Sequence, residues 1–366
     1  MRVLVAPDKF AGTLAAAEAA EAIAAGWRRH APADQLVLAP LSDGGPGFLD
    51  TLHAVLGGRL LAQSVSGPQG EPVPAAVLVA GDTAYVESAQ ACGLHLVPAD
   101  RRDTGASTTY GVGELILTAI RSGARRVIVG LGGSATTDGG AGALAALGAR
   151  PADALRRGGA ALAGLDAVDV APARAAVAGV DLVAASDVDN PLLGLRGASN
   201  VFGPQKGAGP EQVQALDAAL ARWAELTDRA VADLPGAGAA GGLGFGLLLL
   251  GGRRVPGIAT VMEVVGFAAQ LPDVDLVLTG EGAFDPSSLR GKVVSGVAAA
   301  AAAAARPTVV LAGRVEVGRR EQAAAGISGA YAVVDHLAAG EDPLARPADR
   351  LADLAERVAR TWSRPG

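Results

Sequence analysis

The sequence predicts an α/β protein of two domains, in which a parallel-sheet domain is interrupted by a second domain. Three observations lead to this fold class. Short aliphatic runs alternate with longer helical patterns, which is typical of βαβ units. The alternation changes between about residues 57 and 97, where turn signals separate runs of alternating polarity. The 366 residues also suffice for two hydrophobic cores.

The expected strands are short, apolar and mostly of the parallel type. Gly67 and Gly81 mark turns between antiparallel strands that include residues 76–79 and 84–87. The remaining expected strands are residues 3–6, 36–38, 127–129, 182–185, 276–278, 309–311 and 331–334.

Two helices frame the chain in this prediction. The first begins with Thr13 as its N-cap. It buries one face, which carries Ala16, Ala20, Ile23 and Trp27 at helical spacing. The last helix runs from about residue 347 to 362, alternates charged residues with Leu and Ala, and closes the fold.

Parallel-type units at both ends of the chain enclose a different middle. We therefore expect a discontinuous Rossmann-like α/β domain, residues 1–60 plus 257–366, and an inserted α/β domain, residues 61–256. Ligand sites favour the space between two such domains, so we expect the active site in the cleft.

Composition narrows the class of protein. The net charge is −6 and no stretch is dominated by Lys or Arg, which argues against nucleic-acid binding. The single cysteine, Cys92, predicts a small buried side chain and fits a reducing cytosol. No signal peptide is expected, and no apolar run approaches the roughly 20 residues that span a bilayer. A cytoplasmic protein without membrane contact is therefore expected, and a homo-oligomer is compatible with the sequence.

Two loops near the N-terminus follow expected strands. The first, Ala-Pro-Asp-Lys-Phe-Ala-Gly-Thr at residues 6–13, offers Asp8 and Lys9 before a helix N-terminus, where α/β proteins hold anions. The second, Ser-Asp-Gly-Gly-Pro-Gly at 42–47, places Asp43 beside glycines that let a ligand approach the backbone. The alternatives are a plain strand–helix connection and an ordinary glycine-rich turn.

A third loop, residues 132–142, combines glycines, hydroxyls and the start of a helix in Gly-Gly-Ser-Ala-Thr-Thr-Asp-Gly-Gly-Ala-Gly. This composition predicts a phosphate cradle. No Gly-Lys-Ser/Thr follows at the required spacing, so it is not a Walker A loop. The candidate phosphate or nucleotide contacts are Gly132, Gly133, Ser134, Thr136, Asp138 and Gly139.

A fourth segment, residues 187–190, offers Asp187, Asp189 and Asn190 after a strand, which are hard oxygen ligands suited to Mg²⁺ with bound phosphates. One of the carboxylates could instead take a proton from an attacking hydroxyl, and a solvated acidic turn is the alternative. Arg196 and Lys206 follow as candidate partners for phosphate or carboxylate groups.

A fifth segment places Glu281 and Asp285 at another glycine-lined strand end, with Lys292 near the next helix. By contrast, residues 236–241 match the dinucleotide fingerprint only formally, because the residues before them look helical. These glycines are expected to line a loop or a close helix contact.

Together with residues 202–208 and 235–242, these motifs occur in an order that resembles the type-1 glycerate kinase family (glycerate 2-kinase) from the first strand to about Val297. The resemblance implies ATP-dependent phosphorylation of D-glycerate, usually to 2-phosphoglycerate, with Mg²⁺, in a two-domain α/β architecture. Two positions depart from the family pattern. Ala11 stands where the family commonly has Lys, and Ser287 where it often has Gln.

On this hypothesis the hydroxyl of glycerate attacks the γ-phosphoryl group in line. Phosphates would lie on the 132–142 loop, with Lys206, Glu281 and Lys292 as further phosphate or nucleotide contacts. Mg²⁺ would lie near Asp187 and Asp189. Asp189 is favoured as the group that takes the proton, with Asp8 and Asp43 as rivals. The expected substrate contacts are Lys9, Arg196 and Asp285.

Two other functions remain open from the sequence. One is a non-catalytic nucleotide or sugar-acid sensor on the same scaffold, and the other is an NAD-dependent hydroxy-acid oxidoreductase. The acids at the strand ends argue against the sensor, and the missing strand–turn–helix fingerprint argues against the oxidoreductase.

Overall fold

The computed structural model describes residues 1–10, 12–289, 291–338 and 340–364. The chain forms two compact units. Unit 1 contains Met1–Asp43, Asp50–Val55 and Ile258–Gly366, and unit 2 contains Gly44–Leu49 and Leu56–Gly257. Each unit has its own sheet and its own core, so the predicted mixed α/β fold class is confirmed. The assignment of residues 1–60 and 257–366 to one functional domain stays a prediction.

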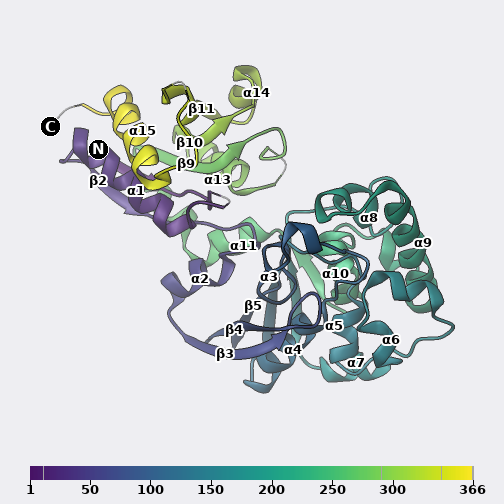
Figure 1. The fold of residues 1–366 in the computed structure, drawn as a ribbon. Helices are drawn as coiled ribbons and strands as arrows, with labels where there is room; N and C mark the ends of the chain where they lie inside the picture. The colour runs from purple at the N-terminus through teal and green to yellow at the C-terminus, as the bar shows by residue number, and fades with distance from the viewer. Residues whose placement is uncertain (11, 290, 339, 365–366) are drawn as a thin grey trace. The chain divides into compact units, whose positions relative to one another are not determined.

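Unit 1 is built on a five-stranded sheet in the order β11-β10-β9-β1-β2 (Figure 1). All of its strand pairs are parallel. The strands are β1 (Arg2–Val5), β2 (Gln35–Leu38), β9 (Leu276–Phe284), β10 (Thr308–Val315) and β11 (Ile327–Ala332). The expected strands are therefore present, but β11 lies earlier than residues 331–334, and Val333 and Val334 follow it.

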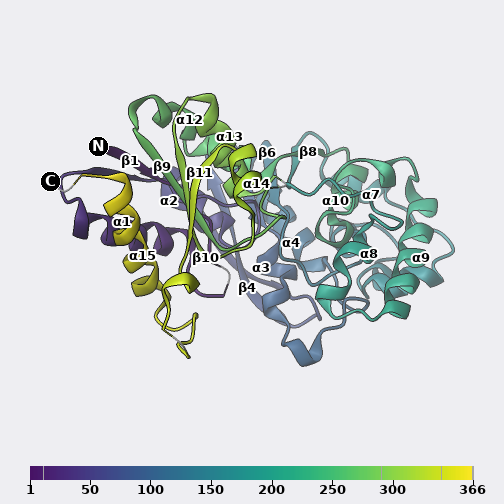
Figure 2. The ribbon, with the colours of Figure 1, turned by 90° about the horizontal axis from the view of Figure 1, so that it is seen from above.

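Helices cover both faces of this sheet. Ile23 and Trp27 of α1 (Ala16–His30) and Leu354 of α15 (Pro347–Trp362) share one core with β1, β9 and β10. Val294 of α13 (Val293–Ala303) belongs to a second core with alternate residues of β10. Figure 2 shows α1 and α15 side by side. The remaining helices of at least four residues near this unit are α2 (Phe48–Leu56), α11 (Gly257–Val264), α12 (Phe267–Gln270) and α14 (Arg319–Ala324).

The start of α1 differs from the prediction, because Thr13 is not its N-cap. The Thr13 hydroxyl donates to Phe10 O at 2.9 Å, and the amides of Thr13 and Leu14 also donate to Phe10 O. These bonds form a separate turn before the helix. The helix begins after Ala15, whose amide donates to the Glu18 carboxylate at 2.8 Å.

Unit 2 is built on a six-stranded sheet in the order β3-β4-β5-β6-β7-β8. The first three strands pair antiparallel, as the hairpin prediction requires, and the other pairs are parallel. The strands are β3 (Arg59–Ser66), β4 (Pro72–Ala80), β5 (Thr83–Glu87), β6 (Arg126–Gly130), β7 (Asp181–Ala185) and β8 (Arg253–Val255). The short strand β8 was not expected from the sequence.

Helices of unit 2 share one large core with the sheet. Cys92 is fully buried in it, as expected, and burial raises the pKa of its thiol to about 12. The helices are α3 (Ala89–Cys92), α4 (Tyr110–Arg121), α5 (Ala141–Ala146), α6 (Ala152–Leu155), α7 (Ala171–Ala176), α8 (Ala198–Phe202), α9 (Pro210–Thr227) and α10 (Ala239–Leu249).

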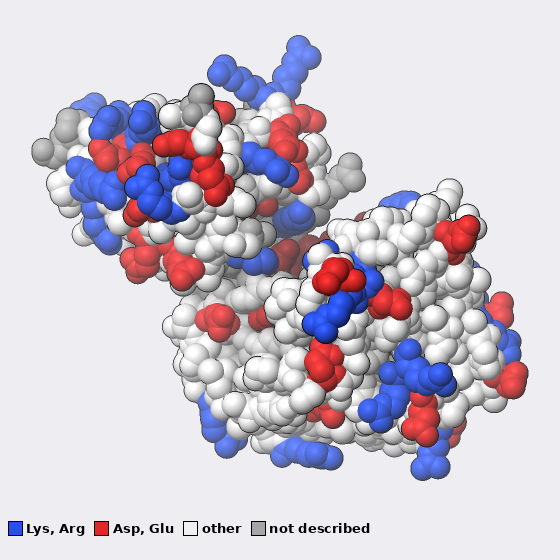
Figure 3. Space-filling view, in the orientation of Figure 1, with Lys and Arg blue, Asp and Glu red and all other residues white. Residues whose placement is uncertain are grey.

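The surface carries both signs of charge. On the face shown in Figure 3, basic and acidic side chains are interspersed within each unit, and neither sign forms a continuous field. Among the described residues, no helix has the length and apolar character needed to cross a membrane.

The packing of α1 on α15 depends on a glycine. A Cβ atom added to Gly26 would lie 1.9 Å from the carbonyl oxygen of Ala352. Even one methyl group therefore forces the two helices apart, which would disturb the core that Trp27 and Leu354 share.

We expect Gly26→Ala to lower the free energy of unfolding by about 1–3 kcal/mol, the usual cost of overpacking a core. Gly164→Ala is the matched control, because nothing lies within 4 Å of a Cβ at Gly164. Urea denaturation should show a lower midpoint for the first variant only. Equal midpoints for Gly26→Ala and the wild type would contradict this packing.

Candidate active site

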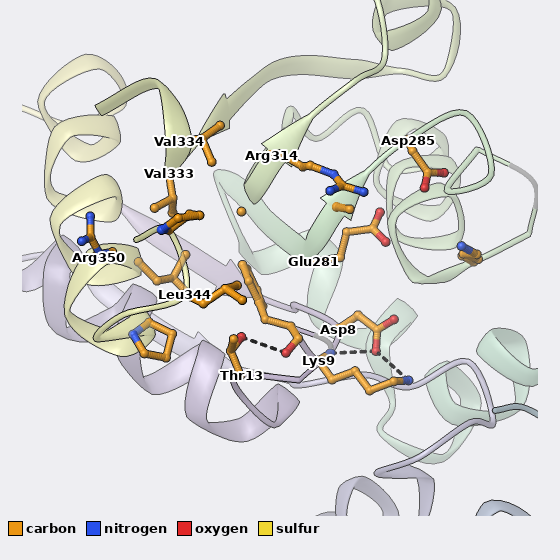
Figure 4. A pocket seen from close by; sticks show the side chains of 18 of the residues that line it. Asp8, Lys9, Thr13, Glu281, Asp285, Arg314, Val333, Val334, Leu344 and Arg350 are labelled. Atoms are coloured by element: carbon orange, nitrogen blue, oxygen red, sulfur yellow. Dashed lines mark hydrogen bonds and ion pairs between the residues drawn. The ribbon is translucent and has the colours of Figure 1, made fainter. Parts of the chain in front are cut away.

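Unit 1 contains a cavity of about 560 Å³ at the carboxyl edge of its sheet. One end of it carries the acids and lysines, and the other is lined mostly by apolar side chains together with Arg350. Figure 4 shows the carboxylates of Asp8 and Glu281 turned to the same side, with Val333, Leu344 and Arg350 at the other end. Six predicted site residues line this one cavity: Asp8, Lys9, Asp43, Glu281, Asp285 and Lys292.

Backbone pairing between β1 and β9 places the two buried acids. The pairing continues past the end of β1, because the amides of Ala6 and Asp8 donate to Leu278 O and Gly280 O at 2.7 and 2.8 Å. Asp8 is thereby fixed next to the strand residue that precedes Glu281. Parallel strands end at the same edge of a sheet, so both carboxylates reach the same cavity.

Glu281 is buried, with 9% of its surface exposed. Its Oε1 atom has no hydrogen-bond partner among the described residues. Burial raises the pKa of Glu281 to about 7, and the nearby charges of Asp8 and Asp285 raise it further, while the Ser288 hydroxyl and Lys292 oppose this shift. Glu281 therefore exchanges a proton near neutral pH.

Asp8 is 7% exposed, and burial raises its pKa to about 6. The Lys9 ammonium lies 3.8 Å from its carboxylate and 3.6 Å from that of Asp43. Lys9 lowers the pKa of Asp8, Asp43 raises it, and the Lys9 amide lowers it by donating to Asp8 Oδ1 at 2.7 Å. The lysine thus lies between two acids at the charged end of the cavity.

Of the two positions that depart from the family pattern, Ser287 lies among the described residues and Ala11 does not. Ser287 takes part in the structure of the site, because the Lys292 ammonium donates to its hydroxyl at 2.7 Å. The Ser287 hydroxyl and amide both hydrogen-bond Asp285, and these bonds hold the pKa of that carboxyl below its usual range. Ala11 lies outside the described residues.

The glycine-rich loop at residues 132–142 lies in unit 2 and is mostly buried. Gly132 and Gly133 reach the surface, whereas Thr136, Asp138 and Gly139 do not. The Asp138 carboxylate accepts hydrogen bonds from the Thr109 amide and hydroxyl, both at 2.8 Å, and from the Gly140 and Gly142 amides at 3.1 and 3.2 Å. In this conformation Asp138 shapes the loop from within, and its direct contact with phosphate stays a prediction.

Lys206 is also internal, with 3% of its surface exposed. Its ammonium donates to Thr136 O at 2.6 Å and to the Ser134 hydroxyl at 3.0 Å, and burial lowers its pKa to about 8. Gly241 packs on the same place, since an added Cβ would lie 1.8 Å from Thr136 O. The glycines at residues 236–241 therefore make a close contact of the expected kind.

The segment after β7 is more exposed than the 132–142 loop. Asp187 is half-buried, whereas Asp189 and Arg196 are exposed. The Asn190 side chain donates to Arg196 O at 2.7 Å and fixes the turn. Across the described ranges, no three His, Cys, Asp or Glu side chains converge on a metal position. The oxygen donors of Asp187 and Asp189 still suit Mg²⁺, which one or two carboxylates plus phosphates hold in many enzymes.

Comparison with known proteins decides the family. Residues 3–363 match the model of the glycerate kinase family. The chain belongs to this family. It is 42% identical to a protein of Bacillus subtilis named glycerate kinase, over 98% of this chain and 96% of that one. It is 39% identical to one of Escherichia coli K12 named glycerate 2-kinase, over 99% and 98% of the two chains.

A solved structure agrees with this result. The crystal structure described as a glycerate kinase 2 of Salmonella typhimurium LT2 matches with a TM-score of 0.80 and 38% identity, covering 99% of this chain and 98% of that one. The predicted family and the prediction of a phosphotransferase are confirmed. Membership of the glycerate kinase family favours a kinase over the sensor and the oxidoreductase.

Sequence reasoning missed several residues of the unit 1 cavity. Arg314 follows Gly313 near the end of β10, so the rule that ligands gather at strand ends could have found it. Leu344 and Arg350 come from the C-terminal segment and α15, and no motif signals them. Arg350 is held in place by the Glu341 carboxylate at 3.0 Å and by Ala345 O at 2.6 Å.

We expect Asp138→Asn to destabilise the protein by about 1–3 kcal/mol, because the amide group of Asn leaves at least one buried N–H donor of the loop without an acceptor. Thermal and urea unfolding measure the effect. Asp100→Asn, at an exposed position, makes the same chemical change and should alter stability by less than about 0.5 kcal/mol. An unchanged unfolding midpoint for Asp138→Asn would show that its four hydrogen bonds do not stabilise the loop.

Proposed function

We propose that this chain transfers the γ-phosphoryl group of ATP to D-glycerate, with Mg²⁺, and forms 2-phosphoglycerate. The observation that carries the proposal is the unit 1 cavity, in which buried acids and lysines meet at the carboxyl edge of a parallel sheet in a member of the glycerate kinase family. Phosphoryl transfer asks a protein mainly for positioning and charge neutralisation, and this cavity offers groups for both.

The acceptor would bind at the charged end of the cavity. Lys9 and Lys292 can neutralise the carboxylate of glycerate, and the acids can accept hydrogen bonds from its two hydroxyls. Asp43 and Asp285 flank these lysines. An acceptor without a carboxylate could not form ion pairs with these lysines, so we expect a preference for hydroxy acids over neutral polyols.

The phosphates are assigned to the groups that the sequence predicts for them. Gly132 and Gly133 offer accessible backbone at the start of the 132–142 loop, and Lys206 holds the loop from within. Arg196 is exposed and able to meet an anion. Asp187 and Asp189 would hold Mg²⁺, which neutralises the charge of the bound phosphates. We assign the protein to the cytoplasm on its single cysteine, which is free and buried.

In a coupled assay with ATP and Mg²⁺, we expect ADP release that depends on D-glycerate, while glycerol gives at least about tenfold less because it lacks the carboxylate that pairs with the lysines. Phosphorus NMR of the product should show phosphate on the C2 oxygen. A reaction without acceptor is the control for ATP hydrolysis. ADP release with D-glycerate that does not exceed this control would contradict the proposed function.

Asp189→Asn separates two roles for this exposed acid. As a ligand of Mg²⁺, its loss should raise the Mg²⁺ concentration needed for half-maximal rate, and saturating Mg²⁺ should restore most of the turnover. As the proton acceptor, its loss should abolish turnover at every Mg²⁺ concentration. We expect the first result in a Mg²⁺ titration of the rate, with Asp100→Asn as the control.

A further inference from the structure

We propose that Glu281 is the catalytic base, with its Oε1 atom taking the proton from the attacking hydroxyl of the acceptor, and that Asp8, fixed beside the strand residue that precedes Glu281, is a positioning residue for it. This inference rests on the proposed function, because it concerns the acceptor site of the same reaction. It replaces Asp189 in the role that the sequence alone favours, and it gives Glu281 a different role from the expected phosphate contact.

The Glu281 carboxylate is buried and incompletely hydrogen-bonded. The Ser288 hydroxyl lowers the pKa of this carboxylate, yet Oε1 has no hydrogen-bond partner among the described residues. Leaving a buried polar atom unpaired costs about 1–3 kcal/mol, so it calls for an explanation. Figure 4 shows this carboxylate facing the cavity, and a hydroxyl bound there would supply the missing partner.

Charged side chains of both signs surround Glu281. Asp8 and Asp285 raise its pKa, and Lys292 lowers it. Lys9, Asp43, Arg314 and Arg350 line the same cavity, so the described charged side chains that line it comprise both signs. The result of burial and these charges is a carboxylate that exchanges its proton close to neutral pH, which is the best range for a general base in a cell.

The other candidate acids differ from Glu281 in exposure or in their partners. Asp189 is exposed, so its carboxylate is surrounded by water and is not held in a packed site. Asp43 shares the Lys9 ammonium, at 3.6 Å. Asp8 is as buried as Glu281, but Lys9 donates its amide to Asp8 Oδ1 and its ammonium lies 3.8 Å away. Glu281 thus carries a buried carboxylate oxygen that has no hydrogen-bond partner among the described residues, which is a contact that a substrate hydroxyl could supply.

The step balances without a further reactant. The acceptor O–H bond breaks and its proton passes to Glu281 Oε1, which becomes a carboxylic acid. The acceptor oxygen forms a bond to the γ-phosphorus while the bond from this phosphorus to the bridging oxygen breaks, and ADP leaves with that electron pair. Glu281 then returns its proton to water, which completes the release of one proton per turnover.

Glu281→Gln keeps the shape of the side chain but removes the base. We expect kcat with D-glycerate to fall by at least about 100-fold, the usual contribution of a general base. Binding of Mg²⁺-ATP, followed by calorimetry, and the melting temperature should stay close to the wild-type values. The matched control is Glu263→Gln, the same change at an exposed position of α11, which should keep the wild-type kcat. Glu281→Asp should restore part of the rate, because it retains a carboxylate.

The pH profile gives a readout that a purely structural role would not move. For the wild type, kcat/KM should fall as the pH drops below about 7, because protonated Glu281 cannot accept a proton. Asp8→Asn removes a negative neighbour that raises the pKa of Glu281, so this acidic limb should move to lower pH. In Glu281→Gln the residual kcat/KM should no longer fall as the pH drops below about 7.

The outcomes separate the two proposals. If the wild type releases no ADP with D-glycerate, the proposed function fails before the role of Glu281 is tested. If the wild type is active and Glu281→Gln retains more than about a tenth of its kcat, Glu281 is not the base. An acidic limb that stays at the same pH in Asp8→Asn would overturn the role of Asp8. If Glu281→Gln does not fold, the kcat/KM–pH profiles of the wild type and of Asp8→Asn still test the role of Glu281. A wild-type profile that does not fall below about pH 7 would contradict the proposal.

Discussion

The hydrogen bond from the Asp8 amide to Gly280 O is the interaction on which the candidate active site of this protein depends. It extends the pairing of β1 and β9 beyond the last residue of β1 and so fixes Asp8 beside Glu281. Gly280 makes this possible, because a Cβ at that position would lie 2.0 Å from the carbonyl oxygen of Leu311 on β10. A side chain there would push β10 away from β9, and the cavity that both strands line would change with it. The glycine before Glu281 is therefore part of the acid site.

In this arrangement the burial of Asp8 and Glu281 opposes the ionisation of their carboxyl groups. A carboxylate at the edge of a packed sheet loses water, and this raises the pKa of both Asp8 and Glu281. Nearby lysines lower these pKa values, but they do not cancel the effect of burial. In the loop at residues 132–142 burial also raises the pKa of Asp138, and four hydrogen bonds to its carboxylate oppose this shift. The hydrogen bonds of Asp138 are made to Thr109 and within the loop, whereas Glu281 keeps a carboxylate oxygen without a hydrogen-bond partner among the described residues.

The sequence predicted the fold well where local pattern determines structure. Aliphatic runs such as residues 276–278 form parallel strands, and the turns at Gly67 and Gly81 join antiparallel ones. It failed at Thr13, since a hydroxyl suited to an N-cap was equally suited to close a turn on Phe10 O. Composition also could not say which polar groups of the 132–142 loop face inward, and Thr136 and Asp138 are buried. Leu344 and Arg350 reach the cavity through tertiary packing, which no local motif records.

The position of D-glycerate in a crystal structure with Mg²⁺ and a non-hydrolysable ATP analogue tests the central claim most directly. The cavity of unit 1 predicts that the attacking hydroxyl lies within hydrogen-bond distance of Glu281 Oε1, at about 2.5–3.0 Å, with the substrate carboxylate facing Lys9 or Lys292. A hydroxyl that instead contacts Asp189, with the unit 1 cavity empty of substrate, would contradict the account.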